Sequence, residues 1–110
     1  MDLITKREEY IGLLNTSLKE AVDKLSKLNN VRRISIFGSY ARGKADLFTD
    51  LDILIIMETD KSFTERIKEL YAMLALPVDM DILCYTPGEF DSMKNTPFLQ
   101  RILAEEVVLL

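Results

Sequence analysis

Residues 31–57 read VRRISIFGSYARGKADLFTDLDILIIM, and this stretch predicts the centre of the fold. Its first part, residues 31–37, alternates polar and β-branched apolar positions, which is typical of a strand. Gly38 and Ser39 follow directly and predict a turn, after which the chain continues as a polar loop. Residues 51–57 are apolar almost throughout, as in a strand buried on both faces. The stretch therefore predicts two strands joined by a turn and a loop.

Helical patterns lie on both sides of these strands. Apolar residues three and four apart predict a long helix over residues 2–29, with a break near Asn15, Thr16 and Ser17, which are weak helix formers. Further helices are predicted over residues 40–44, 63–76, 87–93 and 97–106, a third strand over 78–85 and an edge strand over 107–110. The predicted fold class is therefore α/β (α+β), with one small mixed sheet flanked by helices.

Length and composition limit the class of protein. With 110 residues, 48% of them apolar, we expect a single domain over residues 1–110. No apolar stretch approaches the roughly 18 residues of a membrane span, and no apolar core of a secretion signal follows Met1. A lone cysteine, Cys84, fits a reducing cytoplasm, so we expect a cytoplasmic protein. Apolar helices on so short a chain also leave room for pairing with a partner or a second copy.

Charge and histidine content exclude several functions. The net charge of −4 argues against broad binding to nucleic acid. The absence of histidine removes His-ligated metal sites, Ser-His triads and histidine general bases. Chemistry on this chain must use carboxylates, cysteine, tyrosine, basic side chains, backbone amides or a hard metal ion.

Acidic residues stand at the start of two predicted strands. Asp50 and Asp52 open the second strand, and Asp79 and Asp81 repeat this spacing on the third. Residues two apart in a strand point to the same face, so these carboxylates converge if the two strands are neighbours. Such a cluster is costly without a counter-ion. With carboxylates as the donors, the expected ion is Mg²⁺ or Mn²⁺.

The turn after the first strand supplies a complementary element. A strand that ends in Gly38-Ser39 presents backbone N–H groups and a hydroxyl to an anion, and Arg42 and Lys44 follow within five residues. Carboxylates that hold metal, beside donors for an anion, indicate phosphoryl transfer.

The spacing of these residues resembles a known family. Gly38-Ser39, ten intervening residues and then Asp50-Leu51-Asp52 match the G-S-x(10)-D-x-D signature of the DNA polymerase β-like nucleotidyltransferases. The stretches GSYARGKADLFTDLDILI and VDMDILCYTPGEF are similar to the small prokaryotic minimal nucleotidyltransferase branch. The resemblance covers most of the chain and implies the polymerase β-like fold.

This resemblance also implies roles for individual residues. Asp50 and Asp52 would hold Mg²⁺ or Mn²⁺, and Asp81 would complete the metal site and take the proton of the attacking hydroxyl. Gly38 and Ser39 would bind the phosphates of ATP. The reaction would move AMP to a hydroxyl, and because this branch is commonly paired with HEPN-domain toxins, the protein would be an antitoxin that modifies such a partner.

Several alternatives stay open from the sequence alone. The third ligand could be Asp79 in place of Asp81, although Asp79 is the weaker candidate. Arg42 and Lys44 are either triphosphate contacts or solvated loop charges. The protein is alternatively a non-catalytic antitoxin that neutralises its partner by occlusion. A third function, nucleotide transfer to a small molecule, usually requires acceptor-binding elements beyond a chain of this length.

Overall fold

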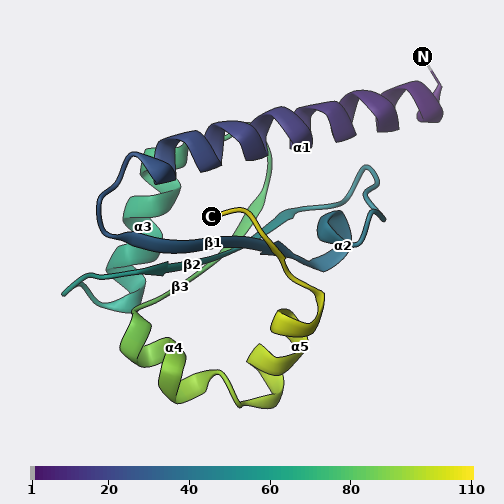
Figure 1. The fold of residues 1–110 in the computed structure, drawn as a ribbon. Coiled ribbons are helices and arrows are strands. Elements are labelled where there is room, and N and C mark those ends of the chain that lie inside the picture. Colours follow the sequence, from purple (N-terminus) through teal and green to yellow (C-terminus); the bar gives the residue numbers. More distant parts are fainter. Residues whose placement is uncertain (1) are drawn as a thin grey trace.

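The computed structural model describes residues 2–110 and contains nine elements along the chain (Figure 1). In order they are α1 (Leu3–Ser26), β1 (Val31–Phe37), α2 (Gly38–Ala41), β2 (Leu51–Met57), α3 (Phe63–Leu74), β3 (Met80–Tyr85), α4 (Pro87–Met93), α5 (Pro97–Glu105) and β4 (Val107–Val108). The bounds of β1, β2 and α4 agree with the pattern in the sequence. The third strand begins at Met80 instead of Val78, and the short helix after β1 begins at Gly38 instead of Tyr40.

The four strands form one mixed sheet in the order β3-β2-β1-β4. Strand β1 runs antiparallel to both β2 and β4, whereas β2 and β3 run parallel to each other. A parallel pair requires a crossover connection, and α3 provides it between β2 and β3. The predicted mixed sheet flanked by helices is confirmed, and the two strands that begin with acids are neighbours.

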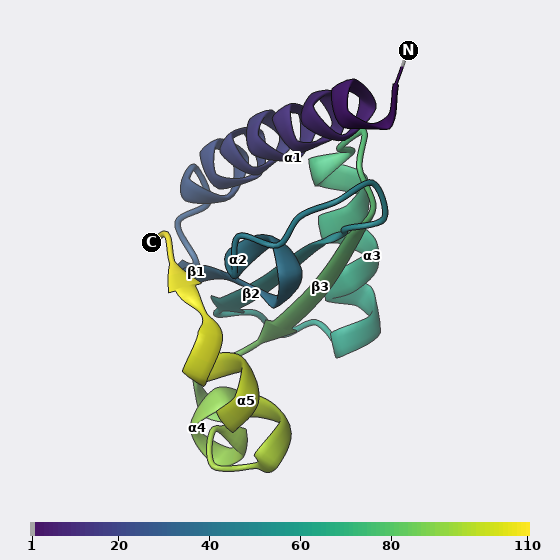
Figure 2. The ribbon, with the colours of Figure 1, turned by 90° about the vertical axis from the view of Figure 1, so that its right-hand side faces the viewer.

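Helices cover both faces of the sheet, which explains the continuous apolar sequence of β2 (Figure 2). Successive residues of a strand point to opposite faces. Ile53 and Ile55 accordingly belong to the core beneath α1 and α3, whereas Leu54 and Ile56 pack with residues of α4 and α5. All four side chains are at most 4% exposed. Strand β2 is therefore buried on both faces and lies between β3 and β1 in the sheet.

Helix α1 is continuous over 24 residues, so the predicted break near Asn15–Ser17 is wrong. Ser17 is buried against the sheet face, between the buried residues Leu14 and Ala21 of the same helix. The Thr16 hydroxyl donates to the carbonyl of Gly12 at 3.2 Å, one turn earlier. Packing of an apolar helix face outweighs the weak propensity of three residues.

Side-chain caps define where the later helices begin. Ser62 accepts a hydrogen bond from the Glu65 N–H at the start of α3, and Thr86 and Glu89 form the reciprocal capping box that the sequence predicts for α4. At the start of α5, the Thr96 side chain accepts a hydrogen bond from the Leu99 N–H. Among residues 2–110, no helix has both the length and the apolar character needed to cross a membrane.

Candidate active site

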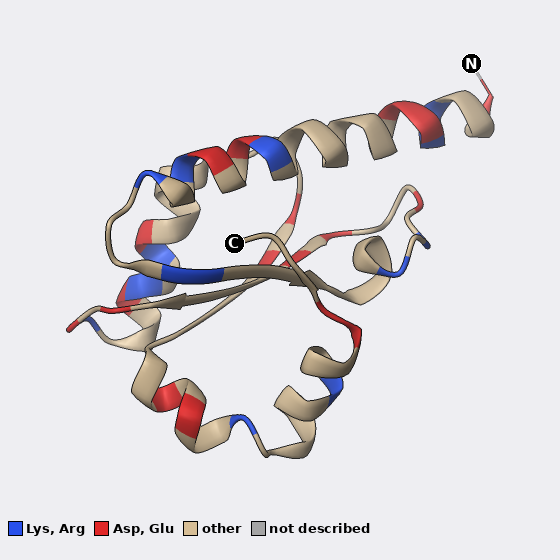
Figure 3. Ribbon diagram, in the orientation of Figure 1, with Lys and Arg blue, Asp and Glu red and all other residues tan. Residues whose placement is uncertain are grey.

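The first residues of β2 and β3 bring two carboxylates side by side. Asp52 and Asp81 are direct partners in the parallel register, and on its other side Asp52 is paired with Phe37, the last residue of β1. Figure 3 shows the acidic segments of the chain in red. Asp50 precedes Asp52 by two residues, just before β2 begins. The acids thus collect where two parallel strands begin and the antiparallel strand between β2 and β4 ends.

Asp52 is the most perturbed acid of this group. Its pKa is raised from 3.8 to about 6, mainly because the carboxyl is partly buried, and further because the charges of Asp81 and Asp50 lie close. A side-chain hydrogen bond with Asp81 and the charge of Glu105 act in the same direction. A carboxylate in such surroundings is stabilised by a neighbouring cation.

Gly38 forms the turn that closes over Asp52. Its φ is +76°, in the left-handed region, and a Cβ atom placed there would lie 2.0 Å from Asp52 Oδ2. The turn can therefore approach the carboxylate only without a side chain at this position. The next residue, Ser39, is half-buried, and its hydroxyl lies 3.4 Å from Arg42 Nη2. Backbone, hydroxyl and guanidinium donors thus stand next to the acids, as an anion would require.

Glu105, the last residue of α5, also reaches this turn, and the sequence did not point to it. One carboxylate oxygen, Oε1, accepts the Gly38 N–H at 3.0 Å, and Oε2 lies 2.8 Å from Arg42 Nη1. In the sequence, Glu105 is part of an acidic pair at the end of a helix, which is typical of a solvated helix end. No local pattern predicts a contact across 67 residues.

Lys44 and Asp79, two residues that the sequence suggests for the phosphate and metal sites, are both exposed. The Lys44 N–H donates to the Ser39 carbonyl at 2.9 Å, but its side chain is exposed on the loop after α2. Asp79 is exposed just before β3, where its carbonyl accepts the Leu51 N–H at 3.0 Å. Asp81, directly opposite Asp52, is therefore better placed than Asp79 to share a ligand with it.

The donor set suits a hard divalent cation. Carboxylate oxygens are the ligands that Mg²⁺ and Mn²⁺ prefer, and the carboxylates of Asp50, Asp52 and Asp81 repel one another without a positive charge between them. In residues 2–110, no three His, Cys, Asp or Glu side chains are arranged so that they could hold a metal ion as they stand. A cation bound by all three would thus require these side chains to move from their present positions. The three-carboxylate metal site stays a prediction.

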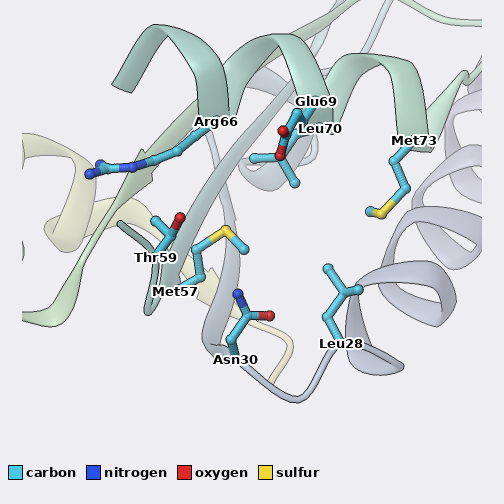
Figure 4. Close-up of a pocket in the computed structure, with 8 residues that line it drawn as sticks. All are labelled: Leu28, Asn30, Met57, Thr59, Arg66, Glu69, Leu70 and Met73. Atoms are coloured by element: carbon cyan, nitrogen blue, oxygen red, sulfur yellow. The ribbon is translucent and has the colours of Figure 1, made fainter. Parts of the chain in front are cut away.

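Other features of the chain are poor candidates for the chemistry. Burial raises the pKa of the Cys84 thiol to about 11, so this cysteine is not a thiolate at neutral pH. A cavity of about 310 Å³ lies near the far end of β2, at Met57, between α3 and the connection from α1 to β1 (Figure 4). The Arg66 guanidinium on its wall is held by Glu89 at 2.7 Å and by the Lys61 carbonyl at 2.7 Å. The acids and the Gly38 turn lie at the opposite end of the sheet.

Comparison with known proteins connects this arrangement to a family. Residues 17–110 match the family model described as the nucleotidyltransferase domain. The chain is 38% identical over 76 residues to the protein adenylyltransferase MntA of Thermococcus cleftensis. This alignment covers 66% of this chain and 73% of that protein. It is 28% identical over 102 residues to MJ0141 of Methanocaldococcus jannaschii, assigned as a protein adenylyltransferase, with 93% of each chain covered.

Solved structures share the fold. A toxin–antitoxin MntA–HpeT mutant superposes with a TM-score of 0.57 at 23% identity and covers 87% of this chain and 70% of that one. A toxin–antitoxin structure with AMP-PNP superposes with a TM-score of 0.53 at 16% identity, over 86% of this chain and 71% of that one. At these identities the likeness concerns the fold.

Proposed function

Because the chain belongs to the nucleotidyltransferase domain family, as a minimal polymerase β-like, MntA-like member, we propose that it transfers AMP from ATP to a hydroxyl of a HEPN-domain partner. The chain is a nucleotidyltransferase of the protein adenylyltransferase type. The proposal adds the nucleotide, a Mg²⁺ or Mn²⁺ requirement, and the role of antitoxin. One solved neighbour of the same fold is a toxin–antitoxin structure, which supports a toxin as the partner of this chain.

The observation that carries the proposal is the pairing of Asp52 with Asp81 beneath the Gly38 turn. Both carboxylates start neighbouring parallel strands, and Gly38 places its backbone within contact distance of Asp52. This arrangement sets acids next to N–H, hydroxyl and guanidinium donors. Acids to hold a metal and donors to hold phosphate are the two requirements of phosphoryl transfer.

Each residue then has a role that follows from its position. Asp50, Asp52 and Asp81 would hold the divalent cation, which when bound offsets the negative charge of the phosphates. Asp81 is exposed and faces solvent, so it would accept the proton of the incoming hydroxyl. That hydroxyl oxygen forms a bond to the α-phosphorus while the bond to the pyrophosphate oxygen breaks, and pyrophosphate leaves.

The turn and the loop after it would bind the triphosphate. The Gly38 N–H and the Ser39 hydroxyl would donate to phosphate oxygens, and Arg42 and Lys44 would add positive charge at the same end. These donors lie on the side of Asp52 that faces the end of β1. The phosphates would thus lie against the turn and next to the carboxylates, not between Gly38 and Asp52, which leaves the Asp81 side open to the acceptor.

A transfer assay with matched variants tests the proposal. Purified protein, a candidate HEPN-domain partner and Mg²⁺ are incubated with ATP labelled at the α-phosphate, and neutralisation of that partner is scored in cells. We expect label on the partner, lost in a double variant with Asp50→Asn and Asp52→Asn and kept in Asp79→Asn. Full neutralisation by the double variant, without any transfer by the parent, would instead support an antitoxin that acts by occlusion.

A further inference from the structure

Glu105 holds the donors that the proposed function assigns to phosphate. Its two carboxylate oxygens accept the Gly38 N–H at 3.0 Å and face Arg42 Nη1 at 2.8 Å. The side chain is 24% exposed, so both contacts are partly shielded from water. The hydrogen bonds from Arg42 and from the Gly38 N–H also hold the pKa of the Glu105 carboxyl below its usual range. It is therefore an anion at neutral pH.

A carboxylate resembles one face of a phosphate group. Both present two oxygens that accept hydrogen bonds from a backbone N–H and a guanidinium, and both form charge-assisted bonds with arginine. Gly38 and Arg42 cannot give the same N–H groups to Glu105 and to a phosphate oxygen at the same time. The carboxylate also adds negative charge beside Asp52, which opposes the approach of a triphosphate.

We propose that Glu105 is an internal competitor of the triphosphate, which occupies the Gly38 and Arg42 donors in the nucleotide-free protein and must leave them when ATP binds. This inference rests on the proposed function, because it takes the Gly38 turn as the phosphate site. Glu105 thereby lowers the affinity for nucleotides that carry β- and γ-phosphates. A nucleotide without those phosphates does not compete with it.

The surroundings of Glu105 indicate that its side chain, and not its helix, moves. Before it, Leu99 and Ile102 anchor α5 in the core and are at most 4% exposed. After it, Val107 and Val108 pair with β1 as strand β4. The backbone is thus fixed on both sides, whereas rotation of the side chain would free both donors. The competition is local to one residue at the junction of α5 and β4.

The neighbouring residue offers a matched control. Glu106 carries the same charge, but its carboxylate is paired with Arg33 and not with the Gly38 turn. Glu105→Gln and Glu106→Gln therefore remove the same charge one residue apart. Glu105→Asp keeps the charge but shortens the side chain by one methylene, so that it cannot reach both Gly38 and Arg42 in the present geometry.

Calorimetric titration with AMP-PNP and Mg²⁺, and separately with AMP, tests the competition. We expect Glu105→Gln to bind AMP-PNP about five to thirty times more tightly than the parent, because a charge-assisted pair no longer has to be broken. Glu105→Asp should also bind more tightly, Glu106→Gln should bind AMP-PNP as the parent does, and AMP affinity should not change in any variant. Melting curves establish that each variant is folded.

Other outcomes overturn the inference in distinct ways. Equal or weaker binding of AMP-PNP by both folded Glu105 variants would show that the carboxylate supports the site and does not compete. The same gain in Glu106→Gln would reduce the effect to net charge, and no binding of nucleotide in any variant would remove the basis of the competition. Transfer to the partner is measured in the same preparations: transfer with unchanged affinity contradicts only this inference, and tighter binding without transfer contradicts only the proposed function.

Discussion

Replacing Asp52 with asparagine should stabilise the metal-free protein at neutral pH and have little effect at acid pH. Folding raises the pKa of Asp52 from 3.8 to about 6, chiefly through burial and then through the charges of Asp81 and Asp50. The folded state therefore keeps a proton that the unfolded state releases first. Stability is lost as the pH rises from about 4 to about 6, and the loss is complete above that range.

The size of the effect follows from this pKa difference. A tenfold change in proton affinity corresponds to about 1.4 kcal/mol, so a rise from 3.8 to about 6 sets an upper limit of about 3 kcal/mol. Asp52 is only partly buried, and screening by solvent reduces this to about 1–2 kcal/mol. In a domain of this size, we expect Asp52→Asn to melt about 5–10 °C above the parent at pH 7.5.

Thermal melting followed by circular dichroism, in buffer with a chelator, checks this prediction from pH 4 to pH 8. The matched control is Asp79→Asn, because Asp79 is an exposed acid near the start of the adjacent strand, and we expect a change within about 0.5 kcal/mol. If Asp52→Asn melted below the parent at pH 7.5, the carboxylate would contribute to stability, and the account of repelling acids would be wrong.

Three further predictions concern the turn, the metal and the far end of the sheet. Gly38→Ala should cost about 1–3 kcal/mol in urea unfolding, because φ is +76° and the new Cβ would meet Asp52 Oδ2; a variant as stable as the parent would refute that geometry. Mg²⁺ or Mn²⁺ at ten times its Kd should stabilise the parent by about 1.4 kcal/mol in thermal melts and leave Asp52→Asn nearly unchanged, whereas an equal response of both would place the ion elsewhere. Arg66→Met should destabilise the fold by about 1–3 kcal/mol, since it removes the hydrogen bonds of a buried guanidinium to the half-exposed Glu89 and to the Lys61 carbonyl, while AMP-PNP affinity stays that of the parent; a change in that affinity would connect this end of the sheet to the active site.

The strands and the acids could be predicted because their signals are local. Alternation in residues 31–37 and the apolar sequence of 51–57 depend on which residues a sheet buries, and both strands occur with the predicted bounds. The closeness of Asp52 to Asp81 needed one more fact, the order of the strands, which the sequence left open. The parallel register of β2 and β3 supplies it.

The features that sequence could not predict depend on distant contacts. Ser17 lies inside a continuous helix because the sheet buries it. The helix propensities of Ser17 and its neighbours do not predict this burial. Glu105 reaches Gly38 only because β4 pairs with β1 and carries the end of α5 to the turn. Both depend on segments far apart in the sequence, and neither leaves a spacing pattern.

The position of the label that reaches the partner tests the central claim most directly. The protein and the proposed HEPN-domain partner are incubated with Mg²⁺ and ATP labelled either at the α-phosphate or at the γ-phosphate, and the mass of that partner is measured in parallel. Nucleotidyl transfer at Asp50, Asp52 and Asp81 predicts label on the partner from the α-phosphate alone, with the mass of one or more AMP groups added. Label from the γ-phosphate, or no label from either with intact folded proteins, would contradict the account.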